Sequence, residues 1–161
     1  MSTGSSVAVK SLSELLVREL SDLRRFCALI EEERNVLTGA QADRLPDIAT
    51  KKSSLAGQLS QLETQRDALL TKGGWPKGRS GVEAWLASHP NTDVKRQWNE
   101  LLKLASQARD GNETNGRLIN LLLKQNQDAL SVLVSGGTES IYGADGQQRS
   151  LAAGKRSFGA V

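Results

Sequence analysis

The 161-residue chain is poor in the residue types that form disulfides, zinc sites and aromatic cores. It has one cysteine and one histidine, which excludes an intrachain disulfide and the usual Cys/His zinc site. Aromatic residues make up only 4%, so the core must consist mainly of Leu, Ala, Ile and Val. No apolar run approaches the roughly 18 residues that span a bilayer, so we expect no direct membrane insertion. The first ten residues lack the apolar core of a secretory signal, and we expect a cytoplasmic protein.

The charge pattern does not favour nucleic-acid binding. The formal net charge is only +3, and 24% of the residues are charged. Arg24–Arg25 and Lys51–Lys52 are isolated basic pairs with acidic residues nearby. A nucleic-acid surface usually needs clustered basic residues with stacking aromatics, so we expect no nucleic-acid partner.

Apolar residues alternate at intervals of three and four along three long stretches, which predicts three helices packed lengthwise. The first follows a capping box at Ser11–Glu14 and is expected to end at Gly39. The second follows Asp43, tolerates Pro46 in its first turn and is expected to end at Gly73. Their seams comprise Leu16, Leu20, Leu23, Cys27, Ile30 and Leu37, then Leu45, Ile48, Lys52, Leu55, Leu59, Leu62, Arg66 and Leu69.

A segment with glycines and prolines, Gly73 to Pro90, separates the second and third long stretches. Inside it, Ser80 to Glu83 is another capping-box pattern, which predicts a short helix from Val82 to Ala87. His89 precedes a proline and ends this helix, because that position disfavours helical dihedral angles. The two tryptophans of the segment are expected to pack over one end of the bundle.

The third stretch keeps its phase from Thr92 to Val134, which predicts one helix of about 64 Å at 1.5 Å per residue. Gly111 and Gly116 lie inside it, with Asn112 and Asn115 on the seam, so we expect a loosely packed or bent region there. The seam comprises Val94, Trp98, Leu101, Ala105, Ala108, Asn112, Asn115, Ile119, Leu122, Asn126, Ala129 and Leu133.

The predicted fold class is therefore all-α: an elongated antiparallel bundle of three long helices with one short helix. The first two long helices are joined by few residues, which makes them antiparallel neighbours. We assign residues 11–135 to the bundle and residues 1–10 to a disordered, frayed arm. Residues 136–161 are rich in Gly, Ser, Gln and Ala, and we predict a flexible tail there.

No residue pattern indicates catalysis, and we expect no catalytic residue, no metal site and no cofactor. The carboxylates are scattered beside basic residues, and Glu31 to Arg34 is most simply a solvated face. His89 lies in a predicted loop, where a structural or solvent-exposed role is expected. Cys27 occupies a seam position that suits a small apolar side chain.

The third helix carries an excess of apolar residues from Leu118 to Leu123. These successive positions turn more than once around the helix axis, so one seam cannot bury them all. Either two helices cover this part or a surface is left for a partner helix. Asn126 and Ala129 lie on the same seam and reduce its apolar contact area. They therefore favour the interpretation that a surface is left for a partner helix. The candidate binding residues are Leu118, Ile119, Leu122, Leu123, Asn126, Ala129, Leu130 and Leu133.

The only tyrosine, Tyr142, lies in the predicted tail among turn-forming residues. Its ring is apolar and its tip polar, which suits a contact residue presented to a partner. The alternative is that Tyr142 folds back onto the bundle.

Taken together, these segments resemble the FlgN family of bacterial flagellar type III export chaperones. The resemblance covers roughly Leu12 to Gln147, and its most specific part is Tyr142–Gln147, with the sequence Tyr-Gly-Ala-Asp-Gly-Gln. The other matching segments are Lys51–Leu55, Leu62–Arg66, Asn115–Gly116 and Asn126–Leu130.

The resemblance implies a cytoplasmic chaperone that binds hook-filament junction (hook-associated) proteins by their C-terminal amphipathic helices and prevents premature assembly. It places cargo binding on Leu118–Leu133. It also implies that Tyr142, with Gly143, Asp145 and Gly146, docks on the cytoplasmic domain of the export gate membrane protein. From the residues alone, a structural coiled-coil adaptor that self-associates through the same seams is the alternative.

Overall fold

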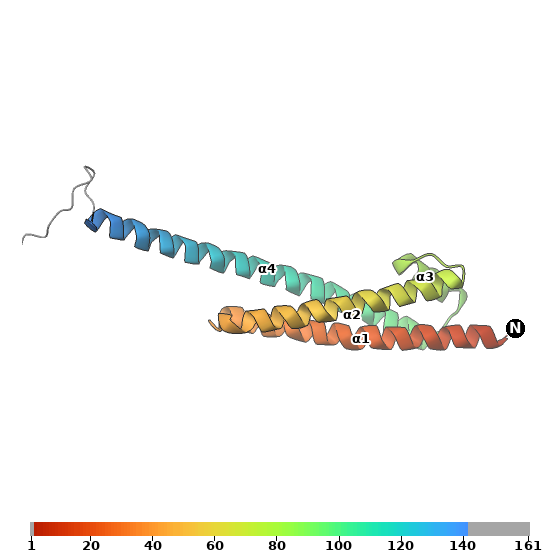
Figure 1. The fold of residues 1–161 in the computed structure, drawn as a ribbon. Helices are drawn as coiled ribbons and strands as arrows, with labels where there is room; N and C mark the ends of the chain where they lie inside the picture. Colours follow the sequence, from red (N-terminus) through yellow and green to blue (C-terminus); the bar gives the residue numbers. More distant parts are fainter. Residues whose placement is uncertain (1, 142–161) are drawn as a thin grey trace, which may run out of the picture. The chain divides into compact units, whose positions relative to one another are not determined.

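The chain forms four α-helices and one 3₁₀ turn in the computed structural model, which describes the backbone of residues 2–141 and the side chains of residues 9–135. In order they are α1 (Ser2–Thr38), η1 (Ala42–Arg44), α2 (Leu45–Lys72), α3 (Gly78–Ser88) and α4 (Thr92–Ile141), as shown in Figure 1. No strand occurs within residues 2–141. The all-α class, with three long helices and one short helix, is confirmed.

The chain divides into two compact units, residues 1–119 and residues 120–161. In the first unit, α2 runs antiparallel to α1, as Figure 1 shows. Two interhelical ion pairs fix the register, because Glu19 pairs with Arg66 while Glu33 pairs with Lys52. The first part of α4 lies against α1, and the Cys27 thiol is 3.8 Å from the Leu104 carbonyl oxygen.

The predicted seams supply the core of the first unit. Leucines of α1 at heptad spacing meet the apolar seam of α2, the inner face of α3 and the first part of α4. Because each helix buries one apolar face against two other helices, leucine and alanine can fill most of the core and few aromatic residues are needed. The central cluster comprises Leu12, Leu16, Leu20, Leu23, Ile30, Leu70, Val82, Trp85, Val94, Trp98, Leu101 and Ala108.

The start of α1 differs from the prediction. The helix begins at Ser2, so residues 2–10 are helical where a frayed arm was expected. The capping box predicted at Ser11–Glu14 is wrong, because both residues lie inside α1 and not at its start. Ser13, between them, donates to Gln97 of α4 at 3.1 Å. Val9 packs against the core, and extending an existing helix by one residue costs much less than starting one.

The short helix α3 also begins earlier than predicted, at Gly78 instead of Val82. Its first free amide finds a partner outside the helix, since Gly78 N donates to the Asp67 carboxylate of α2 at 2.8 Å. The tryptophans of this region pack as expected. Trp85 is buried and stacks on His89 with ring centroids 4.8 Å apart, while Trp75 meets the same ring edge-on at 6.0 Å.

Helix α4 is one continuous helix through Gly111 and Gly116, which confirms the prediction of an unbroken helix. The predicted loose packing is wrong at Asn115, which is 1% exposed and hydrogen-bonded. The helix also continues to Ile141, so residues 136–141 are helical where the tail was expected to begin.

Candidate functional site

The second part of α4 carries the main exposed apolar surface on the described residues. Leu123, Leu130 and Leu133, here called the C-terminal stripe, lie on one face of the helix and have exposed fractions between 53% and 72%. Their neighbours Asn120, Lys124, Asp128 and Ser131 occupy the opposite face at about 100° per residue. The segment is therefore an amphipathic helix with its apolar face open to solvent.

The exposed fractions decide between the two interpretations of the excess of apolar residues at Leu118–Leu123, a covered core or a surface left for a partner. Leu118, Ile119 and Leu122 are half-buried, whereas Leu123 is 53% exposed. Farther along, Asn126, Ala129, Leu130 and Leu133 are all exposed. A covered core turn is thus excluded from Leu123 onward, and an apolar patch of this kind is typical of a binding surface. The role of these eight residues in cargo binding stays a prediction.

The predicted docking segment at the tail has no structural description. Tyr142, Gly143, Asp145 and Gly146 lie outside the described residues. Their role stays a prediction from the family resemblance.

A polar network inside the first unit was not predicted. The Glu33 carboxylate accepts from Lys52 Nζ and from Asn115 Nδ2, each at 2.8 Å. Asn115 Nδ2 also donates to the Ile30 carbonyl oxygen at 2.8 Å, and Lys52 Nζ donates to Asn112 Oδ1 at 2.6 Å. Glu33 is 6% exposed, so the prediction of a solvated face is wrong at this residue. The network joins α1, α2 and α4 in one register.

A second buried pair joins α1 and α2 nearer the α3 end. Arg66 Nη1 donates to Glu19 Oε2, and both side chains are 6% exposed. The Arg66 guanidinium lies 5.3 Å from the Trp98 ring centroid, a cation–π distance. Burial raises the pKa of the Glu19 carboxyl, and the neighbouring Arg66 opposes this shift. The sequence could have indicated both ion pairs, because Glu19 and Glu33 on α1 have the same two-heptad separation as Lys52 and Arg66 on the antiparallel α2.

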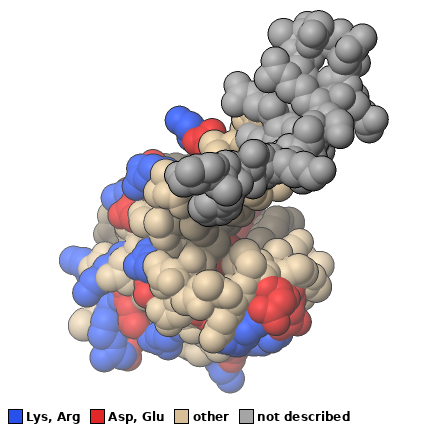
Figure 2. All heavy atoms as spheres, turned by 90° about the vertical axis from the view of Figure 1, so that its left-hand side faces the viewer, with Lys and Arg blue, Asp and Glu red and all other residues tan. Residues whose placement is uncertain are grey.

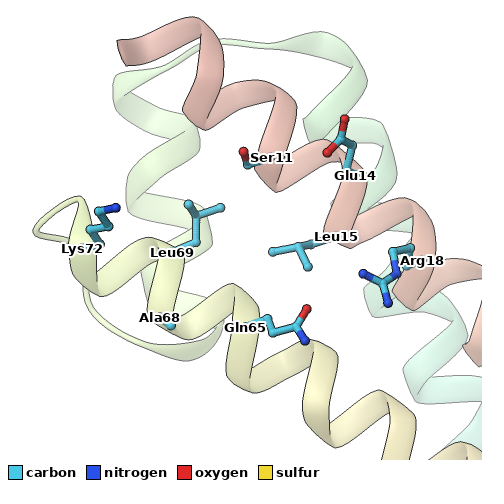
Figure 3. A pocket seen from close by; sticks show the side chains of 8 residues that line it. All are labelled: Ser11, Glu14, Leu15, Arg18, Gln65, Ala68, Leu69 and Lys72. Carbon is cyan, nitrogen blue, oxygen red and sulfur yellow. The ribbon is translucent and has the colours of Figure 1, made fainter.

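The first unit has open grooves between its helices. One of about 460 Å³ lies between α1 and α2, with Leu15 and Leu69 inside it and Glu14, Arg18 and Lys72 around it, as Figure 3 shows. Catalysis requires titratable groups that converge on one substrate position. The charged groups here stand around an apolar floor, and the groove does not define a reaction.

Charges and metal ligands add no further site. Figure 2 shows basic and acidic side chains intermingled on the visible face. Within the described part of the chain, no three His, Cys, Asp or Glu side chains gather as metal ligands. None of its helices is both long and apolar enough to cross a bilayer.

The fold and the stripe define an all-α protein with an exposed amphipathic helix. The family model described as FlgN protein matches residues 1–150. The chain therefore belongs to the FlgN family.

Curated relatives agree with this assignment. The chain is 30% identical to the flagella synthesis protein FlgN of Salmonella typhimurium over 138 residues, which cover 84% of this chain and 89% of the relative. It is 26% identical to the protein of the same name from Proteus mirabilis over 151 residues, or 92% of this chain and 97% of the relative. The Escherichia coli protein of that name is 28% identical over 142 residues, or 84% of this chain and 88% of the relative. No solved structure matches the chain significantly.

Proposed function

We propose that this chain is a cytoplasmic chaperone of flagellar type III export. It binds hook-filament junction proteins through the C-terminal stripe, keeps them from assembling prematurely and delivers them to the export gate. Membership of the FlgN family, whose relatives are named flagella synthesis proteins, supports a role in flagellar assembly. The single observation that carries cargo capture is the exposure of the stripe on α4.

The physical basis of capture is the burial of two apolar faces against each other. An unassembled subunit with an exposed amphipathic helix tends to self-associate, and the stripe offers that helix a complementary partner. Each Å² of apolar surface removed from water contributes about 25 cal/mol. Asn126 and Ala129 interrupt the leucines, which limits the affinity and suits a complex that must later release its cargo.

The cargo test uses the most exposed leucines of the stripe. Leu130→Ala/Leu133→Ala removes apolar contact area without touching the core, because these side chains are 61% and 72% exposed. We expect binding of a purified junction protein to weaken at least about tenfold in calorimetry. Val17→Ala is the matched control, since Val17 is 51% exposed but lies on α1. Equal affinities for the double variant and the control would contradict capture through the stripe.

Delivery requires a second contact, which we assign to the tail. Tyr142→Ala is expected to leave junction-protein affinity unchanged and to weaken binding of the loaded chain to the cytoplasmic domain of the gate protein. Phe158→Ala alters the other aromatic residue of the predicted tail and serves as the control. A loss of cargo affinity in Tyr142→Ala would assign this residue to cargo binding instead.

A further inference from the structure

The buried side chains of α4 end at Asn115. They follow one face of the helix through the first unit, and none of residues 116–135 is buried. The Asn115 amide nitrogen donates to the Ile30 carbonyl oxygen and to the Glu33 carboxylate, each at 2.8 Å. Close anchorage of α4 to α1 therefore extends to Asn115. The buried residues of α4 are Val94, Trp98, Leu101, Ala108 and Asn115.

Gly111 and Gly116 lie on the two sides of this last anchored residue. A Cβ atom at Gly111 would lie 2.8 Å from Ile30 Cγ2, so the close approach of α1 explains that glycine. At Gly116 a Cβ atom meets nothing within 4 Å, and close packing does not explain the glycine. Glycine there instead supplies backbone freedom, because it lowers the stability of the local helix relative to alanine by a factor of about five.

The position of Gly116 decides what this freedom does. Gly57 of α2 also has open space around it, but the helix is held on both sides of it by Leu55 and Leu62, which are 5% and 3% exposed. Gly116 has buried neighbours only on its N-terminal side. Sharp bends in helices occur at glycines when packing does not oppose them. The helix is therefore easier to bend at Gly116 than at Gly57.

Little else stiffens α4 across Gly116. Beyond it, Leu118 and Ile119 are only half-buried. Arg117 pairs with Glu113 across the glycine at 2.8 Å, but these side chains are 69% and 64% exposed, and exposed pairs contribute little. We propose that α4 bends at Gly116, so that the part carrying the C-terminal stripe swings as one arm while residues 92–115 stay packed in the first unit.

Such a bend redirects the C-terminal stripe without unfolding it. Only the helical hydrogen bonds next to Gly116 lengthen, and the apolar face beyond them keeps its phase. One stripe can then meet an amphipathic helix from more than one direction. The bend is a property of the free chain, so it does not depend on cargo capture.

The test measures distances in the full chain by double electron–electron resonance. One pair of spin labels joins Ser53 of α2 to Ser131 beyond Gly116, and a reference pair joins Ser53 to Ser106 before it. All three serines are exposed. The labels are attached in Ser53→Cys/Ser131→Cys and Ser53→Cys/Ser106→Cys, each with Cys27→Ala, so that only the chosen positions react.

Gly116→Ala is the test variant and Gly57→Ala its matched control, because neither added Cβ atom meets another atom within 4 Å. With Gly116 in place, we expect the Ser53–Ser131 distances to be spread about twice as widely as those of the reference pair. Gly116→Ala should narrow this spread, because the bent population falls about fivefold. Gly57→Ala should leave it unchanged.

Two results would overturn the proposal. One is a Ser53–Ser131 distribution as narrow as that of the reference pair, which would show that α4 does not bend. The other is a broad distribution that Gly116→Ala leaves unchanged or that Gly57→Ala narrows equally, which would separate the motion from Gly116.

Discussion

Asn115 of α4 donates a 2.8 Å hydrogen bond to the Glu33 carboxylate of α1, and Asn115 is 1% exposed. The same amide also bonds to the Ile30 carbonyl oxygen, and Arg34 Nε donates to its oxygen at 3.3 Å. Asn115, whose position on the seam predicted loose packing, therefore uses both its amide nitrogen and its amide oxygen in hydrogen bonds. It holds α4 against α1 at one register.

Replacing this amide by an apolar group should destabilise the first unit. Asn115→Leu leaves Glu33 with one fewer donor in a buried site, and we expect a loss of about 2–3 kcal/mol in the free energy of unfolding. Asn112→Ala is the control on the same helix, because Asn112 is exposed and should cost less than about 1 kcal/mol. Urea unfolding measures both. Equal losses would show that burial of the Asn115 hydrogen bonds does not matter.

The Glu19–Arg66 pair should behave as a buried ion pair. Glu19→Leu leaves the Arg66 charge buried without its partner and should cost about 3–5 kcal/mol. The double variant Glu19→Leu/Arg66→Met removes both charges and should recover most of that loss. Denaturant unfolding of the two single variants and the double variant gives the coupling free energy. If the double variant lost as much stability as the two single variants together, the charges of Glu19 and Arg66 would not compensate each other.

Gly111 and Gly116 of α4 should respond in opposite ways to substitution by alanine. A Cβ atom at Gly111 would lie 2.8 Å from Ile30 Cγ2, so the buried Ile30 must shift, and we expect a net loss of stability. At Gly116 a Cβ atom meets nothing within 4 Å, and Gly116→Ala should stabilise the helix by up to about 1 kcal/mol. Thermal unfolding of both variants checks the difference. A gain in both would mean that α1 and α4 are not closely packed at Gly111.

The Cys27 thiol should be unreactive in the folded chain. Burial, aided by the nearby Glu31, raises its pKa above the ordinary value of 9.0. As the pH rises above 9.0 the unfolded chain loses this proton first, so the stability contributed by Cys27 falls as the pH increases. Thiol labelling at pH 8 should be much slower than in urea. The stability difference between wild type and Cys27→Ala should shrink above pH 9, and a constant difference would contradict the raised pKa.

Periodicity predicted the helices well because each seam reports one buried face. Val94, Trp98 and Leu101 are buried as the spacing requires, and α4 passes through its glycines unbroken. The same periodicity pointed to the apolar excess at the end of α4, whose residues the structure exposes from Leu123 onward.

The remaining errors concern contacts between helices. Glu33 appeared solvated because its partners, Lys52 and Asn115, come from two other helices. The capping box at Ser11–Glu14 failed because α1 extends back to Ser2, past the predicted cap, and Val9 packs against the core. A single sequence gives the face of each helix, but the register between helices determines which polar groups are paired.

The most direct test of the account is amide hydrogen exchange of the full chain with and without a purified hook-filament junction protein. We predict that the junction protein slows exchange in residues 120–135, where the C-terminal stripe contacts cargo. Segments of α1 should show little change. Slowed exchange in α1 and α2 with no change in residues 120–135 would contradict cargo capture by the stripe.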